Sequence, residues 1–310
     1  MYARNHVWTG IRRWRPELQF LPPGRQPTSS EAVIGQAMAY AISSREYNDV
    51  VFLGDSPCQM GIDPRVFAKK TGLSGWNLGT MRAFGPYGFL LLTSAYLRHH
   101  PAPKIVVLCV STTLFECDPT VLDGEMRQRL TLSYGAEIAS PLEYIPFVAK
   151  RGAANALNFW SPDVRTEPLL GMPRETYFTL AAKMRAARGF MALPGEHGRP
   201  NGIPLEQPAT LVRHEWDEGC RQIAAQCEAC GAKFLIILAP LLDTFATARD
   251  WPQFARWGKS FHADHPCASI TPPLFYEESL MWDTLHPNAR GVEKFIRTVV
   301  KDVHRVIDRN

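Results

Sequence analysis

Three residues that could act as nucleophile, base and acid lie near opposite ends of the 310-residue chain. Ser56 follows the apolar run VVFL in VVFLGDSP (50–57), and Asp283 and His286 stand three positions apart in DTLHP. That spacing suits a tight turn in which the carboxylate orients the imidazole, and the imidazole takes a proton from a Ser hydroxyl. A free Ser hydroxyl is a poor nucleophile, so this chemistry requires the two segments to meet in the fold.

Each motif also has a purely structural interpretation. Asp and Ser are frequent helix caps and Gly accepts unusual dihedral angles, so GDSP also describes an ordinary strand-to-helix turn. Asp283 is equally suited to cap the helix that follows it, and His286 to be a surface residue before Pro287. The catalytic interpretation therefore depends on both motifs occurring together, each in the expected strand or helix context.

The elements that must position these residues follow from the apolar pattern. Continuous apolar runs between polar residues are typical of strands buried on both faces of a parallel sheet. They occur at 50–54, 104–111 and 233–241, and GWNLGT (75–80) reads as the end of a further strand. Helical patterns fall between and after them, at 31–46, 63–71, 86–100, 214–231 and 291–307. Alternating strands and helices predict an α/β fold with a mainly parallel sheet.

In such a sheet, ligands bind where the strands reach their carboxyl ends. Ser56 lies just past the first of these ends, Gly79 at the second and Thr112 at the third. We therefore expect polar side chains from three separate strands to gather on one rim of the sheet.

The chain is expected to form one α/β domain, residues 31–310, preceded by an N-terminal arm, residues 1–30. The arm ends in the Pro- and Gly-containing stretch FLPPGRQPTSS (20–30). Residues from about 118 to 210 break the strand–helix rhythm and are rich in Pro, Gly and aromatic residues. We interpret this segment as an insertion over one edge of the sheet and not as a second domain.

The composition is that of an ordinary globular protein, 45% hydrophobic and 21% charged, with a formal net charge of +4. No Lys/Arg run is dense enough to indicate nucleic-acid binding. The sequence contains no apolar run of about 18 residues and no signal peptide, so as written it predicts a cytoplasmic protein. A cell-envelope location or membrane association would require an anchor upstream of Met1 or the basic N-terminal arm. The seven cysteines lack a ligand-spaced partner set, and neither a metal nor an organic cofactor is expected.

GDSP (54–57) and DTLHPN (283–288) together resemble the SGNH hydrolase superfamily, also called GDSL-type esterases and lipases. Those proteins carry a Gly-Asp-Ser block after the first strand and an Asp-x-x-His block before the last helix. Their fold is a flavodoxin-like three-layer α/β/α sandwich. The resemblance covers the order of elements from about 48 to 300, although only the two end blocks match closely.

The resemblance implies a role for each matching residue. Ser56 would be the nucleophile, His286 the base and Asp283 the group that orients it. Asp55, although part of the motif, would hold the turn and not act as the acid.

The oxyanion site implied by the resemblance is incomplete. Ser56 and Gly79, the latter in NLGT near Asn77, would supply backbone N–H donors. The family's third block, Gly-x-Asn-Asp, adds an Asn side chain, but this chain has VSTTLFE (110–116), in which Thr112 or Ser111 stands closest. Losing one such donor costs about 100- to 1000-fold in rate.

Three functions follow from these observations. The first is a serine ester hydrolase that acts on a small-molecule or glycan ester through an acyl-serine intermediate. The second is an O-acyltransferase or deacetylase acting on cell-envelope polysaccharide, because the chain is similar to a divergent branch that includes alginate O-acetyltransferase-like proteins. The third is a non-catalytic protein that retains the fold.

Overall fold

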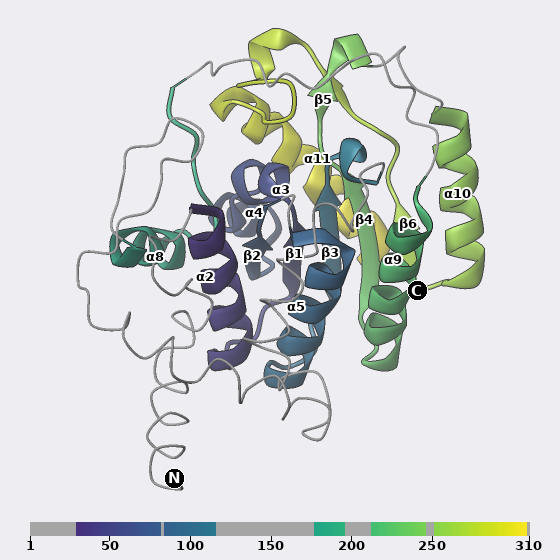
Figure 1. The fold of residues 1–310 in the computed structure, drawn as a ribbon, viewed down its shortest axis with the longest axis horizontal. Coiled ribbons are helices and arrows are strands. Elements are labelled where there is room, and N and C mark those ends of the chain that lie inside the picture. Colours follow the sequence, from purple (N-terminus) through teal and green to yellow (C-terminus); the bar gives the residue numbers. More distant parts are fainter. Residues whose placement is uncertain (1–28, 82–83, 116–176, 196–211, 246–250, 309–310) are drawn as a thin grey trace, which may run out of the picture.

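A computed structural model describes residues 29–81, 84–115, 177–195, 212–245 and 251–308. Its centre is a five-stranded parallel sheet with helices on both faces, a three-layer α/β/α sandwich (Figure 1). The strand order is β2-β1-β3-β4-β6. Counted along the chain, this is the order 2-1-3-4-5 of flavodoxin-like doubly wound sheets. The predicted fold class is therefore confirmed.

All four strands expected from the apolar runs form, and they are buried along nearly their whole length. The sheet contains β1 (Val50–Gly54), β2 (Gly75–Gly79), β3 (Ile105–Val110), β4 (Lys233–Leu238) and β6 (Ala268–Ile270). Gly54 at the end of β1 is paired with Gly79 of β2 and with Cys109 of β3. The carboxyl ends of these three strands therefore lie side by side, and we call this the C-terminal rim.

Side chains of a strand alternate between the two faces of its sheet, and both faces of β1 are apolar. Val51 and Leu53 belong to one core cluster, and Val50 and Phe52 to the other. The first cluster is covered by α2 (Ser29–Ser43), α5 (Gly85–His99), α9 (His214–Ala229) and α10 (Trp251–Asp264). The second is covered by α3 (Ser56–Gly61), α4 (Pro64–Thr71) and α11 (Ala289–Ile307) (Figure 1).

Short elements after β4 hold the segment that carries Asp283 and His286. A two-stranded parallel sheet joins β5 (Leu241–Leu242) to β7 (Phe275–Tyr276), and single 3-10 turns form η6 (Asp243–Phe245) and η7 (Glu278–Leu280). A further 3-10 turn, η3 (Thr112–Leu114), directly follows β3. The N–H of Leu242 donates to the carbonyl oxygen of Thr284 at 3.3 Å. The chain leaving β4 therefore contacts the loop between Asp283 and His286 directly.

Most of the predicted N-terminal arm and most of the predicted insertion lie outside the described residues, so the domain division stays a prediction. The described part of the insertion comprises α8 (Tyr177–Ala186) and the turn after it. It runs along the outer edge of β2, where the N–H of Asn77 donates to the carbonyl of Arg188 at 2.9 Å. Gly189, with φ +90°, packs so closely there that an added Cβ would lie 1.7 Å from the carbonyl oxygen of Asn77.

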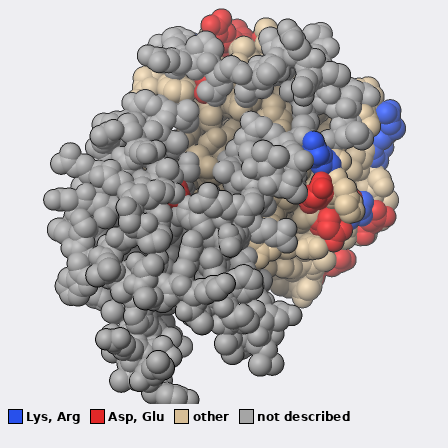
Figure 2. Space-filling view, in the orientation of Figure 1, with Lys and Arg blue, Asp and Glu red and all other residues tan. Residues whose placement is uncertain are grey.

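The described surface has two further features that bear on function. On the right side of the face seen in Figure 2, basic and acidic side chains of the described residues lie close to one another, and a further acidic group lies at the top. Among the helices in the described ranges, none is both long enough and apolar enough to cross a bilayer.

Candidate active site

The nucleophile candidate sits on a sharp turn between β1 and α3. Gly54 ends β1 with φ +151°, and a Cβ at this position would lie 1.7 Å from the carbonyl oxygen of Cys109. Only glycine fits such an approach. Asp55 is the N-cap, Ser56 the first helical residue and Pro57 the second. The turn therefore leaves the half-buried Ser56 at the C-terminal rim.

The two sequence motifs meet at this turn. The Nε2 atom of His286 lies 2.8 Å from the Oγ atom of Ser56, across a separation of 230 residues. The Nδ1 atom of the same ring lies 2.9 Å from both carboxylate oxygens of Asp283. With Nδ1–H donating to the carboxylate, Nε2 is the free acceptor for the Ser56 hydroxyl proton. The three side chains thus form a continuous hydrogen-bonded relay with the geometry of a Ser–His–Asp triad.

Asp283 is held as an ionised acceptor. Its Oδ1 atom also accepts the backbone N–H groups of Leu285 and His286, both at 2.8 Å. Burial alone would raise the pKa of this carboxyl. The hydrogen bonds and charge of His286 and the two backbone donors outweigh burial, so the pKa of Asp283 lies below its ordinary value.

The segment around the triad base is fixed by its own backbone and by Asn288. The N–H of Trp282 donates to the carbonyl of His286 at 2.7 Å and closes the loop. Asn288 is the N-cap of α11 and accepts from the N–H of Gly291 at 3.0 Å. The helix cap is therefore Asn288, and the capping role weighed for Asp283 does not apply.

Asp55 has the holding role that the resemblance implies. It is buried, and both of its carboxylate oxygens lie 3.3 Å from the N–H of Ser111, the first residue after β3. Burial raises the pKa of Asp55 to about 6, against the opposing effects of the Ser111 hydrogen bonds and of the charge on His286. This carboxyl joins the end of β1 to the end of β3 immediately before Ser56.

The contacts of Gly79 differ from the oxyanion role expected for it. Its N–H donates to the Oδ1 atom of Asn77 at 2.7 Å, so this hydrogen is already used within the protein. The Nδ2 atom of Asn77 donates to the carbonyls of Cys58 and Ile62, at 2.9 and 2.8 Å. A Cβ on Gly79 would lie 2.6 Å from the backbone nitrogen of Gln59, so glycine lets α3 approach β2.

Two buried polar side chains at the rim have no hydrogen-bond partner. Thr112, the candidate replacement for the missing Asn, lies in η3 directly after β3, and its Oγ1 atom is unpaired. Gln59 is completely buried, and neither atom of its carboxamide is paired. Gln59 is not among the residues that the sequence motifs predict for the site. The available signal was an amide between the apolar residues Cys58 and Met60, just after the nucleophile.

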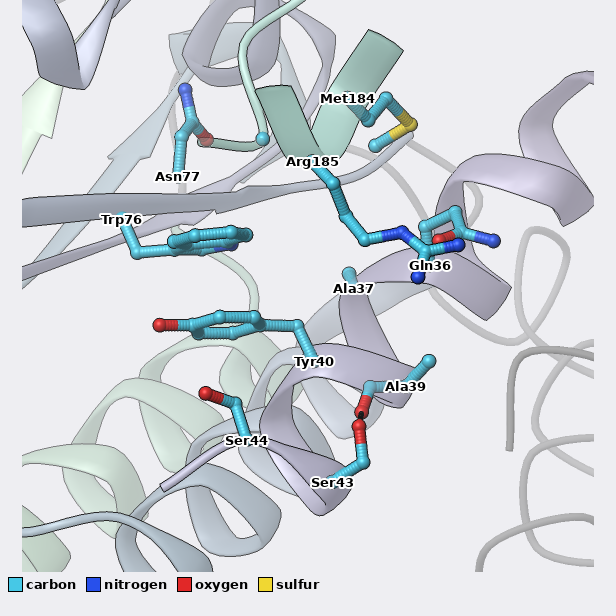
Figure 3. Close-up of a pocket in the computed structure, with 11 residues that line it drawn as sticks. Gln36, Ala37, Ala39, Tyr40, Ser43, Ser44, Trp76, Asn77, Met184 and Arg185 are labelled. Carbon is cyan, nitrogen blue, oxygen red and sulfur yellow. Dashed lines mark hydrogen bonds between the residues drawn. The ribbon is translucent and has the colours of Figure 1, made fainter. Parts of the chain in front are cut away.

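A separate pocket of about 300 Å³ lies between α2, β2 and α8 (Figure 3). Its aromatic wall is the pair Tyr40 and Trp76, whose rings stack with centroids 3.6 Å apart. The carboxamide of Asn77 points away from this pair (Figure 3) and toward α3. None of the three triad residues lines the pocket.

Comparisons with known proteins find similar solved structures but no matching family model or curated protein. A solved structure described as "a putative platelet activating factor from Streptococcus pneumonia" is similar at 11% sequence identity and a TM-score of 0.44. The alignment covers 96% of this chain and 98% of that chain. At this level the likeness assigns neither a family nor an activity, so the functional argument depends on the geometry of the site.

Proposed function

We propose that this protein is a serine ester hydrolase of the SGNH type that works through an acyl-Ser56 intermediate. The observation that supports the proposal is the relay from Ser56 Oγ to His286 Nε2 at 2.8 Å and from His286 Nδ1 to Asp283 at 2.9 Å. A hydroxyl at a rim, a buried imidazole and a buried carboxylate are the three parts that activation of a Ser nucleophile requires.

The first half-reaction forms the acyl-enzyme. Ser56 Oγ attacks the ester carbonyl carbon and gives its proton to His286 Nε2, while the carbonyl π pair moves onto oxygen. Asp283 stabilises the resulting imidazolium. When the tetrahedral intermediate collapses, the bond to the leaving oxygen breaks and His286 returns the proton to that oxygen. The alcohol departs and the acyl group stays on Ser56.

The second half-reaction repeats these steps with water. His286 takes a proton from the water as its oxygen attacks the acyl carbon, and then protonates Ser56 Oγ as that bond breaks. A carboxylic acid and the original hydroxyl are released. We propose a small-molecule or glycan ester as the substrate.

A glycan hydroxyl in place of water would make the protein an O-acyltransferase. Two contacts favour an acceptor larger than water. Residues of the predicted insertion border the site. Trp282 Nε1 donates to the carbonyl of Pro194 at 2.9 Å, and the N–H of Met191 donates to the carbonyl of Gln59 at 3.2 Å. Acyl transfer to an added oligosaccharide, measured against hydrolysis, separates the two reactions. Hydrolysis that dominates at high oligosaccharide concentration would exclude the transferase.

The hydrolase proposal is tested with short p-nitrophenyl esters and a fluorophosphonate probe. We expect the probe to label Ser56 and Ser56→Ala to lose both labelling and turnover. Ser94→Ala is the control, because Ser94 lies on α5 and its hydroxyl donates to the carbonyl of Leu90. A folded protein that neither turns over the esters nor is labelled at Ser56 would leave the non-catalytic alternative. Undiminished turnover in Ser56→Ala would exclude Ser56 as the nucleophile.

A further inference from the structure

In the described part of the chain, several unpaired buried polar atoms belong to residues that lie close in sequence to Ser56, to Asp283 or to Ser111. Seven buried side-chain nitrogen or oxygen atoms there lack a hydrogen-bond partner, and four of them belong to Gln59, Thr112 and Thr284. Thr284 follows Asp283 in the chain, and Thr112 follows Ser111, which holds Asp55. Such atoms cost stability and are rare in native proteins, so their occurrence in these segments indicates groups kept for a ligand.

Gln59 has the largest number of unpaired polar atoms among these residues, because both the nitrogen and the oxygen of its carboxamide lack a hydrogen-bond partner. It lies three positions after Ser56 on α3, and residues three apart are neighbours on a helix surface. Helical side chains lean toward the N-terminus of their helix, which here is the end that carries Ser56. The backbone of Gln59 is fixed at both ends. Its N–H donates to the backbone carbonyl of Asp55 at 3.1 Å, and its carbonyl accepts from the N–H of Met191 at 3.2 Å.

Two other amide groups near the nucleophile, those of Gly79 and Asn77, are already in use. The N–H of Gly79 donates to Asn77, and the Nδ2 group of Asn77 donates to the carbonyls of Cys58 in α3 and of Ile62 just after it. A tetrahedral intermediate formed on Ser56 places negative charge on one oxygen, and that oxygen needs preorganised donors. In the described part of the chain, the unpaired side-chain donors of α3 and of the turn after β3 are the Nε2 group of Gln59 and the hydroxyl of Thr112.

We propose that Gln59 Nε2 donates a hydrogen bond to the oxyanion, in place of the Asn that the SGNH resemblance leads one to expect after β3. The inference rests on the hydrolase proposal and adds a catalytic residue to it. As Ser56 attacks, the carbonyl π pair moves onto oxygen and the Gln59 N–H hydrogen-bonds to that charge. The hydrogen bond weakens when the carbonyl re-forms, and no proton leaves the amide.

The test compares Gln59→Met with Gln226→Met. Methionine keeps the length of the side chain and removes the amide. Gln226 is the control because its Oε1 atom is also buried and unpaired, although its Nε2 atom donates to Ser94 at 2.7 Å, away from the triad. The measurements are the rate of fluorophosphonate labelling at Ser56, kcat and KM for a p-nitrophenyl ester, and Tm.

For Gln59→Met we expect labelling and kcat to fall about 100-fold, with KM nearly unchanged. Its Tm should stay equal or rise, because the amide that is removed makes no side-chain hydrogen bond in the folded protein. Gln226→Met should label at the wild-type rate and have a lower Tm. Wild-type labelling in Gln59→Met, or a clear fall in its Tm, would overturn the Gln59 assignment alone. A wild-type protein that is not labelled at Ser56 would overturn the hydrolase proposal itself.

Discussion

The side chain of Asn77 ties β2 to the helix that carries Ser56, through a hydrogen bond of 2.9 Å to the carbonyl oxygen of Cys58. A second bond from the same Nδ2 atom reaches the carbonyl of Ile62 at 2.8 Å. The α3 helix has only six residues, too few to be stable by itself. The position of the nucleophile therefore depends on a side chain of the neighbouring strand.

Replacing this side chain should affect both stability and the site. Asn77→Ala removes the side-chain donor to the carbonyls of Cys58 and Ile62 and the acceptor of the Gly79 N–H, so the free energy of unfolding should fall by about 2–4 kcal/mol. Labelling of Ser56 should slow as well, because α3 loses its anchor. Urea denaturation and the labelling rate measure the two effects.

Asn48→Ala is the matched control for the Asn77 variant. Asn48 is also fully buried, and it bonds Tyr40 at 2.9 Å and Arg188 at 2.7 Å without touching α3. It should lose comparable stability and keep the labelling rate. Equal labelling rates in both variants would contradict the anchoring role of Asn77.

The carboxylate of Asp283 should matter for turnover far more than for folding. In Asp283→Asn the remaining oxygen can still accept from the N–H groups of Leu285 and His286, but the new NH₂ group donates to Nδ1 and the charge that stabilises the imidazolium is lost. The imidazole then takes the wrong tautomer, and kcat should fall about 10⁴-fold. Turnover and near-ultraviolet circular dichroism measure the two properties. Asp49→Asn, at an acid bound to Ser74 and Lys104, should leave turnover unchanged.

The raised pKa of Asp55 predicts a pH dependence of stability. Its folded-state pKa of about 6 exceeds the unfolded value of about 3.9, so the folded state binds the proton more tightly. This contribution to stability is fully present below about pH 3.9 and is lost as the pH rises through 6. The loss amounts to about 2–3 kcal/mol, since one pKa unit corresponds to about 1.4 kcal/mol.

Asp55→Asn tests that dependence, because asparagine can still accept from the N–H of Ser111 and carries no charge. The variant should be more stable than the wild type at pH 7.5 and about equal to it at pH 4. Urea unfolding of both proteins at pH 4, 5, 6 and 7.5 gives the difference. A difference that does not change with pH would show that the carboxyl is not the titrating group.

The hydroxyl of Thr112 should contribute to the reaction and not to stability. Thr112→Val removes an unpaired buried oxygen at constant shape, so Tm should stay equal or rise while labelling of Ser56 slows about 10-fold or more. Its neighbour Thr113 is bonded to Ser111 Oγ at 2.9 Å, and Thr113→Val should lower Tm instead. A Thr112→Val protein that labels at the wild-type rate would remove Thr112 from the oxyanion site.

The fold was largely predictable from local patterns. Strands such as β1 and β3 are buried on both faces, and two-sided burial leaves an uninterrupted apolar run that is visible in sequence. The strand β6 was not predicted because three residues are too few to show a period. The strands β5 and β7 have only two residues each, and they form because these two segments, distant in the chain, pair with each other.

The roles of individual rim residues were less predictable. Asn77 and Gly79 stand in one short motif, yet their partners lie on α3, about 20 positions earlier in the chain. Gln59 gave no motif signal, because an amide inside a short helix is meaningful only when its surroundings are known to offer no partner. Whether a buried polar side chain finds a hydrogen-bond partner depends on how the chain packs, and sequence spacing does not encode it.

By itself, the sequence determined which residue types stand where the chain turns: an alternating α/β order, a hydroxyl after β1, and an acid and an imidazole three positions apart before α11. Only the tertiary structure decided that His286 reaches Ser56, because contact across 230 residues depends on how the sheet orders its strands. It also decided which donors are used within the protein and which remain unpaired. Hydrogen bonds between distant segments exist only after the chain has packed.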